Sequence, residues 1–593
     1  MKKIIILAIV VWGLIAPLTY HPDTKLTLEY AALDNGKVWD IYGYLNKNKL
    51  EIPDFHYPPV HFYWLKVNYA VSKFIGGSGF DNWLKTNSGE AFLDKDVFKF
   101  NLASKVPLLF LGLITGWAIY KIVKKITGKE SRAGLAAIIW YFNPVTLYSL
   151  VIMGQNDIVA IALFVIGMLV YEYGYFSIFL FVMAAGVKSY PLIWAVLFIL
   201  NLEKIWFKKI FKVGLVMAGY GLILLPWIGK SYFAEAVLNS GLSQRMMIAG
   251  ISVGFEKTIL VIPLILLILC FKSLQSKGGL IKAVEINLVA SIVILGFSHF
   301  NPQWLMWVIF FGTIYWSTKK IVLQDFWLIS LVFLSWIVLI LSFDDRFLIW
   351  GIISPINPGL INFPTLVEFI KNRGGSLVTI VDLAQTSMAA VAIWWLVSCF
   401  RKFKRDVGEI KLEIKDIYIF IPWLLTIAVV IVVGYIKTDK VTVVGVSNKE
   451  EKISSLENRQ WTYEISKNTR YIEVPLSNDG LGSKDESVVV IKNDSNNVIY
   501  KPFSGYNSED RGWLRIDLPK NWIDEKYIKI SMEKTKIVDG NLTASLDNQN
   551  RWAIRIISSQ RIVLSDLVTK FISIWWWWVV LGGISIWYLL IKK

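Results

Sequence analysis

The chain contains few of the residues from which redox centres, metal sites and disulfide scaffolds are built. It has 593 residues but only 2 cysteines and 4 histidines. Cys270 and Cys399 lie within apolar runs, where a thiol packs as a small hydrophobic side chain, so no disulfide framework is expected. The sequence has no metal-ligand spacing, Walker loop, GxSxG motif or nucleotide-binding glycine motif. We therefore expect no metal and no cofactor, and an activated substrate would have to arrive on another carrier, such as a lipid.

Charged residues are missing from long stretches of the chain. Phe326 to Phe343 and Ile417 to Ile436 contain none, and each is long enough to cross about 30 Å of hydrocarbon as a helix. Hydrocarbon offers no partner for backbone N–H and C=O groups, so runs of this kind are expected to be helical. With 55% hydrophobic residues and 27 Trp, the composition predicts an integral membrane protein.

The net charge is +17, and the positions of the cations indicate what this charge is for. They cluster beside the apolar runs, at Lys121–Lys125, Lys204–Lys212 and Arg401–Arg405. Basic residues next to membrane spans mark the cytoplasmic side, so the charge reports orientation and gives no reason to expect nucleic acid as a partner. Membrane lipids are the expected surroundings.

The pattern predicts about fourteen transmembrane helices with both termini in the cytoplasm, in a multi-pass protein of the cell membrane. Residues 1–436 are expected to form the multi-spanning domain, with 21–102 as a long external loop. Met1 to Leu18 resembles a signal peptide, but no small-residue cleavage site follows, so we expect a retained first span. Further spans are expected near 103–120, 133–152, 158–172, 211–228, 255–272, 281–298, 304–317, 326–343, 378–400, 417–436 and 572–591.

The stretch 176–201 allows two interpretations. A single helix would place the Lys204–Lys212 cluster outside, against the charge rule. Two short helices that break at Lys188-Ser189-Tyr190-Pro191 keep it inside. Because Pro191 lacks an N–H and disfavours helix in the residue before it, the broken hairpin is preferred.

Residues 437–570 differ in composition from the rest. Short runs in which apolar and polar residues alternate are separated by Asn, Asp, Gly and Ser, which predicts an extracytoplasmic β-sandwich. The expected strands are Val441–Val446, Tyr471–Leu476, Val488–Ile491, Val498–Tyr500, Trp513–Leu518, Tyr527–Met532 and Trp552–Ile556. A last transmembrane helix is expected over 571–593, where Trp575 to Trp578 suit the membrane interface.

The polar residues of interest are those that this topology places at the outer face. They are Asp23, Asp40, Asp54 and Tyr57 in the first loop, Gln155 and Asp157 in the turn after the third span, Lys188 in the hairpin, Arg245, and His299 and Gln303 in a later turn. A lysine within a span is costly and usually has a functional partner. Lys188 is therefore expected to bind an anionic phosphate, to pair with a carboxylate inside the protein, or to extend its ammonium group to the membrane surface. Asp157 at a helix start also suits a simple cap.

Over residues 1–320 these motifs resemble, in order and sidedness, the GT-C glycosyltransferase superfamily, particularly its polyprenyl-phosphate-sugar-dependent, mannosyltransferase-like members. An acid follows the first span (Asp23), and the later motifs are Tyr57-Pro58-Pro59, Gly154-Gln155-Asn156-Asp157, Lys188 to Pro191, and His299 with Pro302-Gln303-Trp304.

The resemblance implies transfer of a hexose such as mannose from a polyprenyl-phosphate donor to a glycan, lipid or protein acceptor, with inversion. Asp23 would be the general base, with Asp40 and Asp54 as rivals. Lys188 would stabilise the lipid phosphate, helped by His299 or Arg245, and Gln155 and Asp157 would orient the sugar or the base. A flippase for lipid-linked glycans, or a polymerase or ligase of surface polysaccharide, is the alternative.

Overall fold

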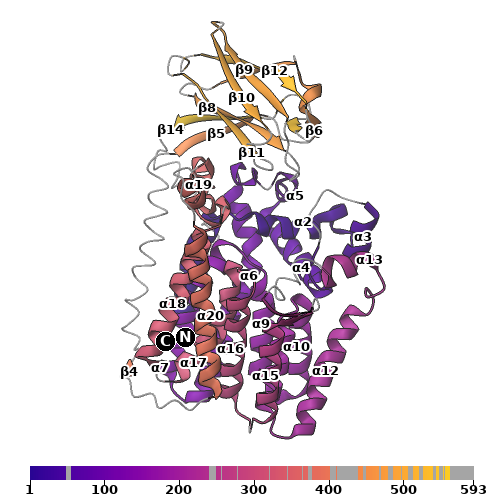
Figure 1. The fold of residues 1–593 in the computed structure, drawn as a ribbon, viewed down its shortest axis with the longest axis vertical. Coiled ribbons are helices and arrows are strands. Elements are labelled where there is room, and N and C mark those ends of the chain that lie inside the picture. The colour runs from indigo at the N-terminus through magenta and orange to yellow at the C-terminus, as the bar shows by residue number, and fades with distance from the viewer. Residues whose placement is uncertain are drawn as a thin grey trace, which may run out of the picture.

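A computed structural model gives the arrangement of the chain (Figure 1). The structure describes residues 1–400, 409–410 and 438–560, except for gaps at 49–54, 240–248, 372–376, 478–484, 505–511, 538–542 and 547–551 and several shorter ones. The described chain is mostly helical and carries a C-terminal β-sheet region. These two coarse features of the expected fold are confirmed.

The first hundred residues form one apolar helix and a helical cap. α1 (Lys2–Ile15) and η1 (Ala16–Leu18) are followed, after an 84° bend, by the next helix. The expected external loop 21–102 is itself helical, comprising α2 (Pro22–Gly36), α3 (Ile41–Asn48), α4 (Pro59–Gly76), α5 (Phe80–Lys85) and η2 (Ala91–Leu93). These elements share a core of their own, rich in aromatic side chains.

The helical bundle holds the largest core. Its first part comprises α6 (Val97–Thr127), α7 (Glu130–Phe142), α8 (Pro144–Thr146), the π-helix η3 (Leu147–Ile152), α9 (Asp157–Leu169), η4 (Tyr171–Tyr173), α10 (Tyr175–Val187), α11 (Pro191–Leu202) and α12 (Trp206–Leu224). After α13 (Ser231–Phe233) and the π-helix η5 (Ala234–Leu238) come α15 (Val261–Leu274), α16 (Leu280–Phe297), η7 (Pro302–Trp304), α17 (Leu305–Thr318), α18 (Leu323–Leu341) and α20 (Val378–Phe400). The segment between α18 and α20 contains η8 (Arg346–Leu348), η9 (Trp350–Ile353), η10 (Pro358–Asn362) and α19 (Leu366–Lys371).

The break expected between Lys188 and Pro191 is confirmed. α10 ends at Val187 and α11 starts at Pro191. Two contacts show that the helices run in opposite directions. The rings of Phe181 in α10 and Phe198 in α11 pack 5.6 Å apart, and Tyr171, just before α10, donates to Glu203, just after α11. The hairpin therefore returns the chain to the end of the bundle from which it came.

The count of about fourteen spans is not confirmed. Among the described residues, three helices (α6, α16 and α20) are long and apolar enough to cross a membrane, or five if each of two bent helix pairs is one span. α9, α10 and α11 have 13, 13 and 12 residues, about 18–20 Å of helix against about 30 Å of hydrocarbon. The expected spans 417–436 and 572–591 lie outside the described residues.

The expected span 255–272 needs a correction at its start. Strands β1 (Gly250–Gly254) and β2 (Lys257–Leu260) pair antiparallel before α15 begins at Val261. The β-branched residues of this stretch favour a strand, and the hairpin satisfies the backbone groups that a helix would have satisfied. Ile251 and Ile259 remain exposed.

Each of the seven strands expected in 437–570 overlaps an observed strand. They are β5 (Thr438–Val444), β8 (Thr469–Ser477), β9 (Glu486–Asn493), β10 (Val498–Ser504), β11 (Gly512–Asp517), β12 (Tyr527–Lys536) and β14 (Ile554–Gln560). Three further strands, β6 (Lys449–Lys452), β7 (Gln460–Glu464) and β13 (Thr543–Leu546), were not expected. A short β3 (Ile321–Val322) pairs with β4 (Glu409–Ile410) away from this domain.

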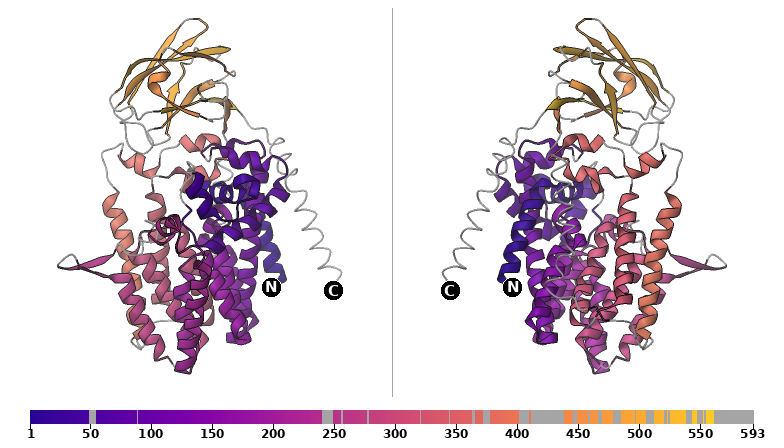
Figure 2. Two further views of the ribbon diagram at one scale, coloured as in Figure 1. Left: turned by 90° about the vertical axis from the view of Figure 1, so that its right-hand side faces the viewer. Right: turned by 90° about the vertical axis from the view of Figure 1, so that its left-hand side faces the viewer.

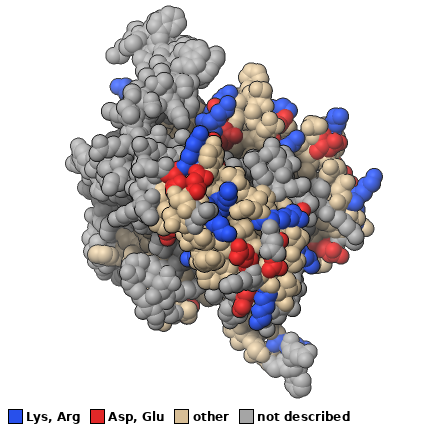
Figure 3. Space-filling view, turned by 90° about the horizontal axis from the view of Figure 1, so that it is seen from above, with Lys and Arg blue, Asp and Glu red and all other residues tan. Residues whose placement is uncertain are grey.

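The strands of the C-terminal domain form two sheets that share one core. One has the order β10-β9-β12-β7, and the other β5-β14-β8-β13-β6 with β11 paired to β8. Ile472 of β8 and Ile530 of β12 lie in the same buried cluster, so the sheets pack face to face. Figures 1 and 2 show the domain at the end of the bundle where the helical cap lies. The described part of this end, seen from above in Figure 3, carries acidic and basic side chains interspersed.

Candidate active site

Asp23 stands at the start of α2, just beyond the bend that follows α1. Pro22 occupies the first helical position, and His21 precedes it in an extended conformation that begins the helix. His21 Nδ1 accepts the Asp23 N–H at 3.2 Å. Since Nδ1 is used as an acceptor, it has no proton to offer the Asp23 carboxylate 3.7 Å away. His21 therefore fixes the helix start and does not neutralise Asp23.

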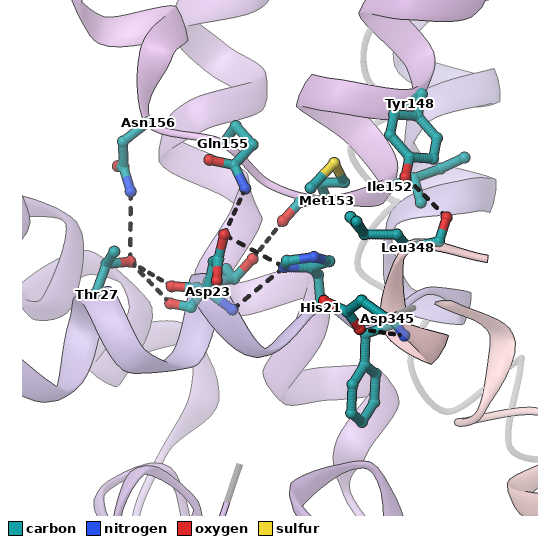
Figure 4. A network of polar contacts seen from close by, with 12 residues as sticks. His21, Asp23, Thr27, Tyr148, Ile152, Met153, Gln155, Asn156, Asp345 and Leu348 are labelled. Carbon is teal, nitrogen blue, oxygen red and sulfur yellow. Dashed lines mark hydrogen bonds and ion pairs between the residues drawn. The ribbon is translucent and has the colours of Figure 1, made fainter. Parts of the chain in front are cut away.

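The Asp23 carboxylate is held from one side and open on the other. Gln155 Nε2 donates to Asp23 Oδ2 at 3.0 Å, and 51% of the Asp23 side chain is exposed. In Figure 4 the His21 ring lies between Asp23 and the turn that carries Asp345. His21 is buried, and within the described chain its Nε2 has no hydrogen-bond partner. The carboxylate thus has free acceptor capacity toward a ligand.

The turn that supplies Gln155 depends on a glycine. The π-helix η3 precedes it, a distortion often found near functional sites. Gly154 has a φ of +68°, and a Cβ there would meet Thr24 Oγ1 at 2.8 Å. Thr24 Oγ1 in turn donates to Met153 O at 2.5 Å. The turn is therefore packed directly onto the first turn of α2, which keeps Gln155 beside Asp23.

Asp157 and Lys188 form a buried ion pair behind this turn. Lys188 Nζ donates to Asp157 Oδ2 at 2.9 Å. Asp157 is fully buried, and its other oxygen accepts from Tyr190 Oη and Trp307 Nε1, each at 3.0 Å. Of the alternatives for Lys188, pairing with a carboxylate is present. The Asp157 side chain binds neighbouring helices and does not cap α9.

Lys188 also faces the first-loop motif. Its Nζ lies 4.8 Å from the centre of the Tyr57 ring, and 13% of its side chain is exposed. Tyr57 stacks on His61 with ring centroids 4.2 Å apart. Burial raises the pKa of the Tyr57 phenol, so the ring stays neutral under Lys188. The Asp23 and Lys188 charges lie close enough to interact electrostatically.

Of the remaining sequence candidates, the structure describes Asp40, His299 and Gln303. Asp40 forms an ion pair with Lys230 and accepts from Gly43 N–H at 3.1 Å and Trp227 Nε1 at 3.2 Å. Partial burial acts to raise the Asp40 pKa, but the hydrogen bond from Lys230, followed by that from Gly43, outweighs it and holds the pKa below its usual value. His299 is exposed after α16, and Gln303 lies in η7. Asp54 and Arg245 lie outside the described residues.

Lys105 of α6 was missed by the sequence reasoning. It is 1% exposed and donates to Ala16 O, Thr19 O, Thr19 Oγ1 and Ile152 O at 2.6–3.1 Å. Lys105 thus links the end of η1 to the end of η3. The sequence alone could have singled out Lys105, because it falls within the expected span 103–120 and a charged residue inside a membrane span usually has a function.

The segment after α18 also reaches this site. Tyr148 Oη donates to Leu348 O at 2.8 Å, and Tyr20 N–H donates to Ile352 O at 2.8 Å (Figure 4 shows the first). The Phe347 ring packs edge-on against Tyr20 at 5.7 Å. The resemblance ended near residue 320, so it gave no reason to expect residues 347–352 here.

Within the part of the chain that the structure describes, no three His, Cys, Asp or Glu side chains are grouped so as to hold a metal ion. No protein-family model matches the chain, and no curated protein matches its sequence.

Proposed function

We propose that the protein is a GT-C-type membrane glycosyltransferase that moves a hexose from a polyprenyl-phosphate donor to an acceptor at the outer face of the cell membrane. The observation that carries the proposal is a pair of opposite charges at one end of the bundle. Asp23 is half-exposed and only partly hydrogen-bonded, while Lys188 is largely buried and paired with Asp157, two residues from the Gln155 that binds Asp23. A base and a cation are the two groups that this transfer needs.

In the proposed reaction Asp23 removes the proton from an acceptor hydroxyl. The hydroxyl oxygen attacks the anomeric carbon of the donor sugar from the face opposite the phosphate. The bond between the anomeric carbon and the phosphate oxygen breaks, and its electron pair leaves with the polyprenyl phosphate. The sugar therefore inverts. Gln155 orients the Asp23 carboxylate through its 3.0 Å hydrogen bond.

Lys188 stabilises the leaving phosphate, which departs as an anion and needs no proton. Asp157 holds the Lys188 ammonium through one of its three N–H donors, so the others remain for phosphate oxygens. Asp157 thus acts through Lys188. Its carboxylate is fully buried and already accepts from three donors, which leaves it no access to the sugar. Tyr57 lies against Lys188 and restricts its position.

The proposed architecture keeps about fourteen spans, with both termini cytoplasmic and the helical cap and β-domain extracytoplasmic. Apolar surface supports the membrane placement. α15 and α20 expose Leu267 (57%), Phe271 (66%) and Leu383 (62%), which water would not favour. Helices too short to span alone are compatible with a membrane when they are buried among others, as α9 and α11 are.

The test is transfer by the purified full-length protein in lipid vesicles. Polyprenyl-phosphate hexoses are offered as donors, nucleotide hexoses serve as the comparison, and a panel of glycan, lipid and peptide acceptors is supplied. We expect turnover only with the lipid-linked donors, and a loss of about 10²- to 10⁴-fold in Asp23→Asn. Asp96→Asn, which removes an exposed acid elsewhere in the cap, is the matched control and should keep full activity.

Two results contradict the proposal. One is turnover that survives Asp23→Asn unchanged. The other is translocation of the lipid-linked sugar across the vesicle membrane with no glycosidic bond formed, which identifies a flippase.

A further inference from the structure

A second polar cluster lies at the opposite end of the bundle from Asp23. Between α16, α17, α18 and α20 there is a small pocket of about 20 Å³, lined by Glu285, Tyr315, Asp325, Ser398 and Cys399 among others. Glu285 and Asp325 lie near the starts of α16 and α18, whereas Tyr315 and Cys399 lie near the ends of α17 and α20. Figure 1 shows these ends away from the β-domain. The pocket is therefore remote from the candidate active site.

Three lysines from different helices converge on this pocket. Lys272 lies in the last turn of α15, Lys282 in the first turn of α16, and Lys319 directly after α17. Lys282 and Lys319 both reach Glu285, which lines the pocket, and Lys272 lies against the ring of Phe400, the chain neighbour of the lining residue Cys399. The side chains of Lys282 and Lys319 are 35% and 37% exposed, which leaves their ammonium groups accessible.

The acids present do not fully balance these cations. Lys282 and Lys319 share one carboxylate, with Glu285 Oε2 at 3.1 Å and 3.7 Å. Lys272 has no carboxylate partner among the described residues. Its Nζ lies 3.9 Å from the centre of the Phe400 ring, and it is close enough to Lys282 for the two charges to repel. Among the side chains that the structure describes around the pocket, three ammonium groups face two carboxylates, Glu285 and Asp325, which leaves one positive charge that a phosphodiester would neutralise.

The helices beside the cluster present apolar surface to the outside. On α15, Leu264, Leu267, Ile268 and Phe271 are 40–66% exposed, and their spacing of three, one and three residues places them on one face. On α20, Ile393 and Phe400 are 48% and 47% exposed. α16 contacts both helices and lies between them. A ligand with an anionic head at the lysines and acyl chains along α15 and α20 fits both features.

We propose that Lys272, Lys282 and Lys319 form a binding site for the phosphate headgroup of an anionic phospholipid of the inner leaflet. The proposal rests on the membrane placement of the bundle and is independent of glycosyl transfer, because none of its residues belongs to the candidate active site. The phosphate accepts hydrogen bonds from the lysines, and Tyr315 Oη, which already receives a bond from Lys319 at 3.1 Å, lies beside it.

Native mass spectrometry of the purified full-length protein tests this site. Phosphatidylglycerol and phosphatidylcholine with identical acyl chains are titrated into detergent-solubilised protein. We expect phosphatidylglycerol to bind more tightly, and the double variant Lys272→Gln/Lys282→Gln to lose about 10- to 30-fold of that affinity. Binding of phosphatidylcholine should not change. Lys208→Gln, which removes an exposed lysine of α12 at the same end of the bundle, is the control and should bind as the unmodified chain does.

A thermal-unfolding measurement separates binding from misfolding. Phosphatidylglycerol should raise the Tm of the unmodified chain and of Lys208→Gln, but not that of the double variant. Equal binding of the two lipids, or an equal loss in Lys208→Gln, overturns the proposal. So does competition by soluble glycerol phosphate at the concentration at which the lipid binds, because the head alone would then account for recognition. Loss of transferase activity in Asp23→Asn has no bearing on this result.

Discussion

Replacing one member of the Asp157–Lys188 ion pair should lower the free energy of unfolding far more than replacing both members. The two charged atoms are 2.9 Å apart, and Asp157 is fully buried. At an effective dielectric constant of about 20, charges at this separation attract by roughly 6 kcal/mol. Much of this offsets the desolvation of both ions, so the pair as a whole contributes little net stability. A single substitution leaves the other charge buried without its partner.

We therefore expect Lys188→Met to lower the free energy of unfolding by about 3–5 kcal/mol, and Asp157→Asn by a comparable amount. The double variant Asp157→Asn/Lys188→Met should recover most of this, to within about 1–2 kcal/mol of the unmodified chain. The interaction free energy of the cycle is then about 4 kcal/mol or more. The double variant should nevertheless be inactive in hexose transfer, because it lacks the cation that we propose stabilises the phosphate.

Reversible unfolding in mixed micelles, followed by circular dichroism, measures the cycle. Lys125 and Glu172 provide the control cycle, since their charged atoms are 2.6 Å apart but their side chains are 49% and 74% exposed. That pair should couple by no more than about 1 kcal/mol. Additive costs for Asp157 and Lys188, with a coupling below about 0.5 kcal/mol, refute the reasoning. A stable and fully active double variant refutes the role of Lys188 in catalysis.

Three further outcomes are expected. Gly154→Ala should lower the Tm more than Gly128→Ala does. Both glycines have φ near +67°, but an added Cβ meets Thr24 Oγ1 only at Gly154. Equal losses of Tm in the two variants contradict this. Lys105→Met should lower the free energy of unfolding by about 1–3 kcal/mol, because its buried carbonyl acceptors lose their donor. Lys124 is half-exposed, so Lys124→Met should lower it by less than about 1 kcal/mol. Unfolding in mixed micelles measures both variants. Gln155→Leu should lower kcat of hexose transfer about 10-fold with little change in donor KM, by removing one hydrogen bond to a charged group; an unchanged kcat excludes the orienting role.

The sequence predicted the regular parts of the fold from local rules. Pro191 fixed the break between α10 and α11, because proline disfavours helix in the residue before it. Alternating apolar residues located the strands of the C-terminal domain. The three strands that were missed are short, and Lys449–Lys452 has no apolar residue from which to recognise a pattern.

The helix lengths could not be predicted in the same way. Hydropathy reports how apolar a segment is, but not where a turn or a strand ends the helix. The helix expected from residue 255 begins only at Val261, because Lys257–Leu260 pairs with Gly250–Gly254 as a strand, and hydropathy alone does not separate a short apolar strand from a helix.

The site was predicted in part. Gln155 beside Asp23, and the nearness of Lys188, followed from the expected sidedness of the motifs. That Asp157 is the partner of Lys188 could not be deduced, since the sequence does not say which of several acids a hairpin will approach. Lys105 and the 347–352 segment reach the site through tertiary packing alone.

The most direct measurement is the anomeric configuration of the product formed from a polyprenyl-phosphate hexose, determined by nuclear magnetic resonance before the sugar can mutarotate. With Asp23 as general base and the phosphate leaving from the opposite face, the new glycosidic bond should have the anomeric configuration opposite to that of the donor. A product that retains the donor configuration requires a covalent sugar–enzyme intermediate or front-face attack, and would contradict the assignment of Asp23.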